Sequence, residues 1–124
     1  MFEVSISKAF SAAHLISNIG GYCEQLHGHN FTVEVTVAGK QLNPEGLLID
    51  FRDLKKRLND ILDTLDHQYL NETEAFRVVS PSAENIAQHI FSLLNQTMTD
   101  GNTFVRRVDV WESDNAKASF VADP

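Results

Sequence analysis

The stretch HNFTVEVTV, residues 29–37, alternates polar and apolar side chains along most of its length. Alternation with a period of two is typical of a β-strand with one buried face, because successive side chains point to opposite sides of a sheet. Phe31 and three valines form the apolar set, and His29 shares their phase. The stretch therefore predicts a strand with a histidine near one end of its buried face.

A neighbouring strand is expected at residues 2–14. Apolar residues recur at period two from Phe2 to Ala12, with Lys8 as the one break, and His14 is in phase with them. Extended geometry would turn His14 toward the inward face. Two adjacent strands thus each offer a histidine near one end of the same face.

Two amphipathic helices are expected in the middle of the chain. The first follows the N-cap candidate Asp50, and leucines and isoleucines at three-and-four spacing extend it over 51–65. The second begins at Ser80-Pro81-Ser82, where a hydroxyl cap stands beside a proline suited to a first helical turn, and runs through 83–98. Strands are then expected at 104–112 and 118–122.

The expected order, ββααββ, predicts an α+β fold with an antiparallel four-stranded sheet and both helices on one face. A length of 124 residues fits one domain, 1–124, and 43% hydrophobic residues are enough for a core. The net charge of −7 argues against binding a nucleic-acid backbone. A single cysteine, no apolar span and no leader-like N-terminus predict a cytoplasmic protein without membrane contact.

The candidate metal ligands are His14, His27 and His29. Three imidazoles with an open fourth position are a common catalytic zinc set, and nitrogen donors favour zinc over calcium or magnesium. A His-x-His pair on an extended segment points both rings to one side. The alternative is that His14 is a core histidine and that residues 27–29 form a polar turn.

For the other candidate residues, sequence spacing leaves more than one role open. Cys23 is a fourth zinc ligand, an inert buried thiol or a catalytic thiolate. Asp66 can fix the tautomer of His67, although a histidine also suits a helix C-terminus. Glu112 shares the phase of Val108 and Val110. It would suit a ligand with two adjacent N–H donors, or it is a solvated strand end.

Taken together, these residues resemble the 6-pyruvoyltetrahydropterin synthase family over nearly the whole chain. The resemblance rests on His14, Cys23-x-x-x-His27-Gly28-His29, residues 46–51, Leu65-Asp66-His67-x-x-Leu70-Asn71, residues 81–85 and Glu112. The three residues between Cys23 and His27 are similar to the 6-carboxytetrahydropterin synthase branch of the queuosine pathway. The animal pyruvoyl enzymes typically have a longer gap there.

The resemblance implies the tunnelling fold, in which subunits join their sheets into a barrel, commonly a homohexamer built as a dimer of trimers. It implies Zn²⁺ on the three histidines and catalysis by Cys23, Asp66 and His67. It also implies a pterin anchor in Glu112 and a pterin contact from Ser82, where the family usually has threonine. Active sites between subunits would bring Glu112 to the first loop.

The activity that this implies is conversion of 7,8-dihydroneopterin triphosphate to 6-carboxytetrahydropterin, with acetaldehyde and triphosphate released. Elimination of triphosphate to the 6-pyruvoyl product is the sister alternative. A folate-pathway variant is a further one, since such versions carry a glutamate in the cysteine loop and Glu24 adjoins Cys23. A zinc-stabilised binding module without turnover is the alternative from another class.

Overall fold

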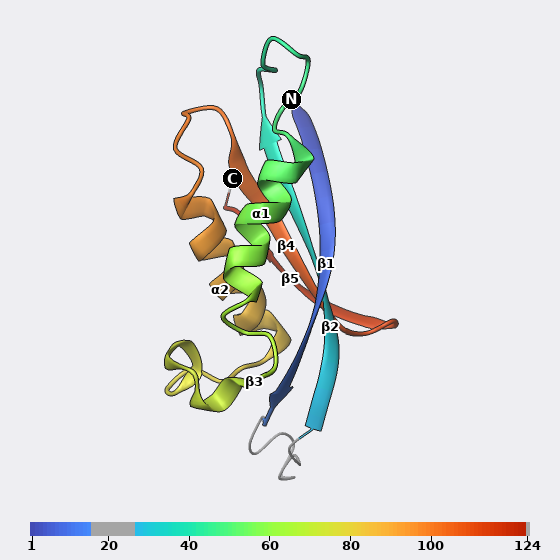
Figure 1. Cartoon of the computed structure of the whole chain (residues 1–124), viewed down its shortest axis with the longest axis vertical. Coiled ribbons are helices and arrows are strands. Elements are labelled where there is room, and N and C mark those ends of the chain that lie inside the picture. The colour runs from blue at the N-terminus through green and yellow to red at the C-terminus, as the bar shows by residue number, and fades with distance from the viewer. Residues whose placement is uncertain (16–26, 124) are drawn as a thin grey trace.

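The computed structural model describes residues 1–15 and 27–123, which form one curved sheet with two helices against one face (Figure 1). The order of strands across the sheet is β3-β1-β2-β4-β5. The strands are β1 (Phe2–His14), β2 (His27–Gly39), β3 (Gln68–Tyr69), β4 (Phe104–Ser113) and β5 (Ala116–Val121), and the helices are α1 (Phe51–Leu62) and α2 (Ala83–Gln96).

Strands β1 and β2 pair antiparallel in unbroken register, from Phe2 opposite Gly39 to His14 opposite His27. The expected alternation is confirmed on both strands. Ile6, Phe10, Ala12 and His14 of β1 are buried, whereas Ser5, Ser7 and Ala9 are exposed. This register places the histidine-bearing ends of the two strands side by side.

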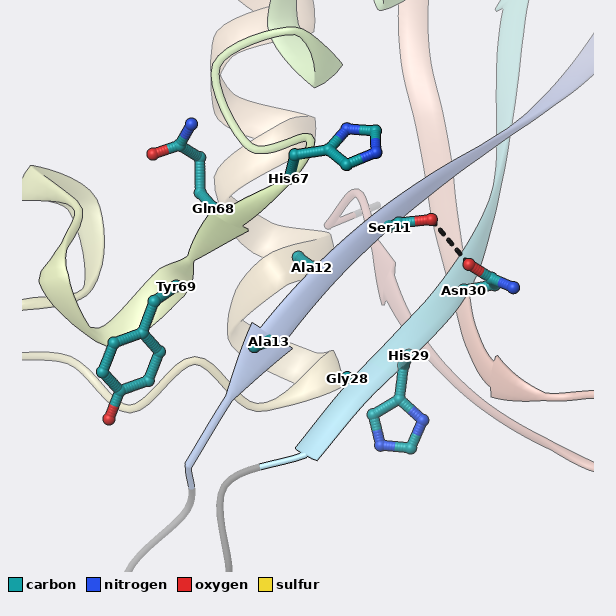
Figure 2. Close-up of a pocket in the computed structure, with 9 residues that line it drawn as sticks. All are labelled: Ser11, Ala12, Ala13, Gly28, His29, Asn30, His67, Gln68 and Tyr69. Carbon is teal, nitrogen blue, oxygen red and sulfur yellow. Dashed lines mark hydrogen bonds between the residues drawn. The ribbon is translucent and has the colours of Figure 1, made fainter.

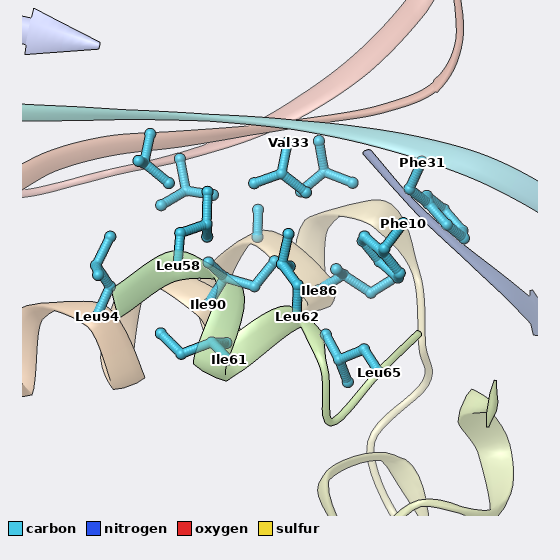
Figure 3. Packing of buried hydrophobic residues seen from close by; sticks show 14 of the residues in the cluster. Phe10, Phe31, Val33, Leu58, Ile61, Leu62, Leu65, Ile86, Ile90 and Leu94 are labelled. Carbon is cyan, nitrogen blue, oxygen red and sulfur yellow. The ribbon is translucent and has the colours of Figure 1, made fainter. Parts of the chain in front are cut away.

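The core lies between the sheet and the two helices (Figure 3). Valines and Phe31 of β2 face leucines of α1 and isoleucines of α2, and most of these side chains are fully buried. Burial of this size stabilises each large side chain by about 1.5–3 kcal/mol. No helix in the described ranges is long and apolar enough to cross a membrane.

The expectation of a purely antiparallel four-stranded sheet is wrong, because a fifth strand is present. Strand β3 runs parallel to β1 and pairs Gln68 with Ala12 and Tyr69 with Ala13. A strand of two residues has no measurable periodicity, so its sequence gave no signal. It lies in the segment 66–80, which also contains two short 3₁₀ turns.

The helix starts follow the expected caps with one correction. Asp50 caps α1 by accepting from the N–H of Arg52 at 2.8 Å, and Ser82 caps α2 by accepting from the N–H of Asn85 at 3.1 Å. We expected Pro81 in the first turn of α2, but it precedes the cap. Helix α1 ends at Leu62, before the last residue of its apolar stripe, yet Leu65 remains buried in the following turn.

Side chains extend the short β1–β3 ladder at both of its ends. The N–H of Ser11 donates to Asp66 Oδ1 at 2.9 Å. At the other end, the amide of Asn71 accepts from the N–H of Leu15 and donates to its carbonyl, both at 2.8 Å. The side chain of Asn71 thereby replaces a strand partner and fixes the backbone directly after His14.

We expect replacement of Asn71 with alanine to lower the free energy of unfolding by about 1–3 kcal/mol, because both polar groups of the part-buried Leu15 backbone lose their partner. Urea denaturation measures the change. Asn115→Ala, in the exposed turn before β5, is the matched control and should change stability by less than about 0.5 kcal/mol. Equal stability of the two variants would show that the two hydrogen bonds between Asn71 and the Leu15 backbone do not stabilise the fold.

Candidate active site

Three potential metal ligands from three neighbouring strands meet on the helix-covered face of the sheet. They are His14 of β1, His29 of β2 and Glu112 of β4, and one ligand atom of each lies within 4.8 Å of the others. The strand alternation explains the meeting, because each residue shares the phase of the apolar set on its own strand.

His14 is fully buried, and its ring orientation is fixed by a backbone partner. Its Nδ1 lies 2.8 Å from the carbonyl oxygen of Pro81, just before α2. A carbonyl only accepts, so Nδ1 carries the proton and donates. Phe31 packs edge-on against the ring, with centroids 5.3 Å apart, and His29 does so at 5.2 Å. The Nε2 atom is thereby turned toward Glu112.

Glu112 lies at a β-bulge between Trp111 and Ser113, where the pairing of β4 with β5 shifts register. Bulges re-aim side chains and are frequent beside active sites. The carboxylate Oε1 lies 3.2 Å from His14 Nε2, and the Glu112 side chain is 34% exposed. Glu112 therefore reaches the histidines within one chain, and this contact needs no neighbouring subunit.

Two residues predicted from the sequence, His27 and Cys23, are not fully described by the structure. The backbone of His27 belongs to β2 and pairs with His14, as a three-histidine set requires, but its side chain lies outside the described part. Cys23 lies outside the described residues altogether.

Asp66 and His67 are in contact, as a carboxylate that fixes the tautomer of His67 requires, with Asp66 Oδ2 3.0 Å from His67 Nδ1. His67 has a positive φ of 58°. Its N–H donates to the Ser11 carbonyl at 2.6 Å, which holds it in this unusual backbone conformation. Donation from the Ser11 N–H lowers the pKa of the Asp66 carboxyl against the effect of burial, and attraction to His67 adds to it.

A pocket of about 440 Å³ lies over the ends of β1 and β2 and the segment 67–69. Its lining residues are Ser11, Ala12, Ala13, Gly28, His29, Asn30, His67, Gln68 and Tyr69 (Figure 2). His29 and His67 both line it, but their rings point in different directions (Figure 2). Among the described residues, His67 is not a member of the group formed by His14, His29 and Glu112.

Ser82 and two basic residues of α1, Lys56 and Arg57, have structural partners. The Ser82 hydroxyl caps α2, which leaves its proton available to a ligand. Lys56 pairs with Asp60, and Arg57 pairs with Asp53, on the same helix. The Pro81 carbonyl was missed at the sequence level, since a backbone contact between distant segments leaves no side-chain pattern.

The donor set suits a transition metal. Two imidazoles and a carboxylate are ligands that zinc takes readily, whereas calcium and magnesium prefer oxygen alone. Metal-binding histidines usually donate their other ring N–H to a carbonyl or carboxylate, as His14 does from Nδ1, and this leaves the Nε2 lone pair for the metal. The residues present therefore fit a zinc ion.

Comparison with known proteins relates the chain to enzymes that act on pterins. A sequence model described as 6-pyruvoyl tetrahydropterin synthase matches residues 3–123. An Archaeoglobus fulgidus protein provisionally named 6-carboxy-5,6,7,8-tetrahydropterin synthase is 40% identical, over 94% of this chain and 93% of its own. A Synechocystis protein of that name is 34% identical over 90% and 87%. A Pyrococcus furiosus dihydroneopterin monophosphate aldolase is 35% identical over 84% and 83%.

The fold is shared with solved structures. The 6-pyruvoyl tetrahydropterin synthase of Caenorhabditis elegans superposes with a TM-score of 0.83 at 24% identity, over 98% of this chain and 96% of that one. At this identity the likeness concerns the fold, and it identifies the sheet and two helices as a tunnelling fold. The chain therefore belongs to the 6-pyruvoyl tetrahydropterin synthase family of enzymes.

Proposed function

We propose that the protein is a zinc-dependent 6-carboxy-5,6,7,8-tetrahydropterin synthase of queuosine biosynthesis. It would convert 7,8-dihydroneopterin triphosphate and water to 6-carboxytetrahydropterin, acetaldehyde and triphosphate. The observation that carries the proposal is the convergence of His14, His29 and Glu112 on one sheet face. The relatives of the same name that match most of the chain support this choice of product.

His14, His27 and His29 would hold the zinc ion. The tautomer of His14 and the pairing of His14 with His27 across β1 and β2 support this set. When bound, zinc supplies Lewis acidity toward the two side-chain hydroxyls of the substrate and lowers their pKa.

Side chains of the protein would carry out proton transfer and bind the pterin ring. Cys23, as a thiolate, would remove protons from the substrate side chain, and His67 would return or remove them. Asp66 holds the His67 ring through Nδ1, which leaves Nε2 for proton transfer. Glu112 would accept hydrogen bonds from the 2-amino group and the ring N3–H of the pterin, and the Ser82 hydroxyl would add a weaker contact.

The proposed assembly is a cytoplasmic homohexamer, a dimer of trimers whose sheets join into a barrel. Both sheet edges offer strands for such pairing. In the described part of the chain, β3 covers β1 only at Ala12 and Ala13, and β5 pairs with β4 alone. Phe2 and Val121 are about half exposed at these two edges. Exposed edges are the usual sites of strand addition between chains. An active site between subunits would also bring a His67 to each metal group.

The alternatives differ in product. The 6-pyruvoyl activity, from which the family takes its name, eliminates triphosphate and keeps the side-chain carbons. The Pyrococcus furiosus relative favours an aldolase as a further candidate. Such an enzyme would leave a hydroxymethyl group on the pterin and a phosphorylated two-carbon aldehyde.

Mass spectrometry of the products separates these activities. We expect the zinc-loaded protein to release acetaldehyde and to form 6-carboxytetrahydropterin from 7,8-dihydroneopterin triphosphate. Heat-inactivated protein is the control for spontaneous breakdown of the substrate. A 6-pyruvoyl or a hydroxymethyl pterin without acetaldehyde would refute the proposed product and select the corresponding alternative.

Replacement of Cys23 with alanine separates catalysis from metal binding. We expect the variant to keep its zinc and its fold and to lose activity by about 100-fold or more, because the proposed proton acceptor is gone. Zinc content, circular dichroism and product formation measure these effects. Cys23→Ser is the conservative companion. Loss of zinc and unfolding of Cys23→Ala would instead support a closed structural site and a binding module.

Replacement of Asp66 with asparagine tests the orienting pair. Activity should fall while zinc affinity stays unchanged, because the amide cannot fix the His67 tautomer. The lowered pKa of Asp66 means that its carboxylate adds stability above the ordinary value of 3.8, and that this stability is lost as the pH falls through the native pKa. The stability difference from wild type should therefore shrink between neutral pH and about pH 3 in urea denaturation. A pH-independent difference would show that ionisation of Asp66 is irrelevant.

A further inference from the structure

The contact between His14 and Glu112 joins two atoms that both accept. Donation from Nδ1 to the Pro81 carbonyl leaves Nε2 of a neutral imidazole with a lone pair. An ionised Glu112 has only acceptor oxygens, and its Oε1 lies 3.2 Å from this Nε2. Such a pair is attractive only when a cation or a proton lies between the two atoms.

The distance between His14 and Glu112 matches that of two ligands on a shared metal ion. With metal–ligand distances of about 2.0–2.2 Å, two ligand atoms at neighbouring corners of a zinc tetrahedron lie about 3.3–3.5 Å apart. The 3.2 Å contact is close to this edge length, and His29 supplies a third ligand atom within 4.8 Å of the other two. Glu112 therefore lies where a metal ligand would lie.

Glu112 also has room to leave the metal. Its side chain is 34% exposed, in contrast to the fully buried His14, and its position at a bulge separates it from the regular ladder. A second pocket of about 190 Å³ adjoins it, lined by Ala83, Glu84, Ala116, Lys117 and Ala118. The carboxylate can thus face either the histidines or this open side.

We propose that Glu112 ligates the metal beside the histidines in the substrate-free enzyme and that the pterin ring withdraws it. The proposal rests on the proposed function for the identity of the ring. Two adjacent N–H groups of a pterin engage both carboxylate oxygens, so pterin binding and metal ligation compete for Glu112. Withdrawal opens a coordination position, as a catalytic zinc site requires, only when substrate is present.

The first measurement is zinc affinity, determined by competition with a chromophoric chelator. Loss of a residue that only hydrogen-bonds to a metal ligand weakens metal binding by roughly 10- to 100-fold. Because Glu112 would be a ligand itself, Glu112→Gln should weaken zinc binding by at least this factor. Glu112→Asp keeps the charge on a shorter side chain, and its zinc affinity should lie between those of Glu112→Gln and wild type. Glu84→Gln removes the same charge from the neighbouring pocket and should bind zinc as tightly as wild type.

The second measurement is the visible spectrum of the cobalt-substituted protein, with pterin itself as the probe because it lacks the side chain. Addition of pterin should change the cobalt spectrum of wild type and of Glu84→Gln. Glu112→Gln should differ from wild type without pterin and should not respond to it. Circular dichroism verifies that each variant is folded.

Unchanged zinc affinity and an unchanged cobalt spectrum in Glu112→Gln would overturn the proposal, because a proton would then occupy the contact. A lower zinc affinity without any response of wild type to pterin would overturn the withdrawal. Both measurements are independent of turnover. A protein that passes them but forms no 6-carboxytetrahydropterin would contradict the proposed function and leave the metal role of Glu112 standing.

Discussion

The unbroken antiparallel register of β1 with β2 is the constraint on which the site depends. The two strands pair over their full length, which places His14 opposite His27 and Ala12 opposite His29. Side chains alternate between the faces of a sheet, so a slip of one residue would turn the histidines of one strand to the helix-free face. The hydrophobic core prevents this slip, since it would expose buried residues such as Phe31 and Phe10. Core packing and ligand placement are therefore determined by the same alternation.

The helices contribute backbone groups to the site as well as a core. The cap of α2 at Ser82 fixes the chain just before it, and the Pro81 carbonyl there orients His14. On the other side of β1, the turn after α1 leads into the segment 66–71. Asp66 and Asn71 attach this segment to Ser11 and Leu15. Both attachments lie on the edge of the strand that carries His14, so this strand is held from the helix face and from its edge.

Much of this arrangement could be predicted from the sequence, because it follows from periodicity. The long strands, both helices, the burial of His14 and the inward phase of Glu112 all arise from patterns of period two or 3.6. Strand β3, the position of Pro81 and the contact between Glu112 and His14 could not be predicted. A two-residue strand has no period, and contacts between distant backbone and side-chain atoms require the three-dimensional fold. The roles of Cys23 and Ser82 remain predictions from the family resemblance.

The two carboxylates of the site differ in how firmly they are held, and this difference suits different tasks. Asp66 accepts from the Ser11 backbone with one oxygen and from His67 with the other, so rotation of its carboxylate would break both contacts. Its lowered pKa follows from the same donors. Glu112 lies at a bulge, in contact with His14 and with an open pocket beside it. A carboxylate held in one orientation can orient a proton-transfer group. A carboxylate with space for a second orientation can exchange partners when a ligand with two N–H donors binds.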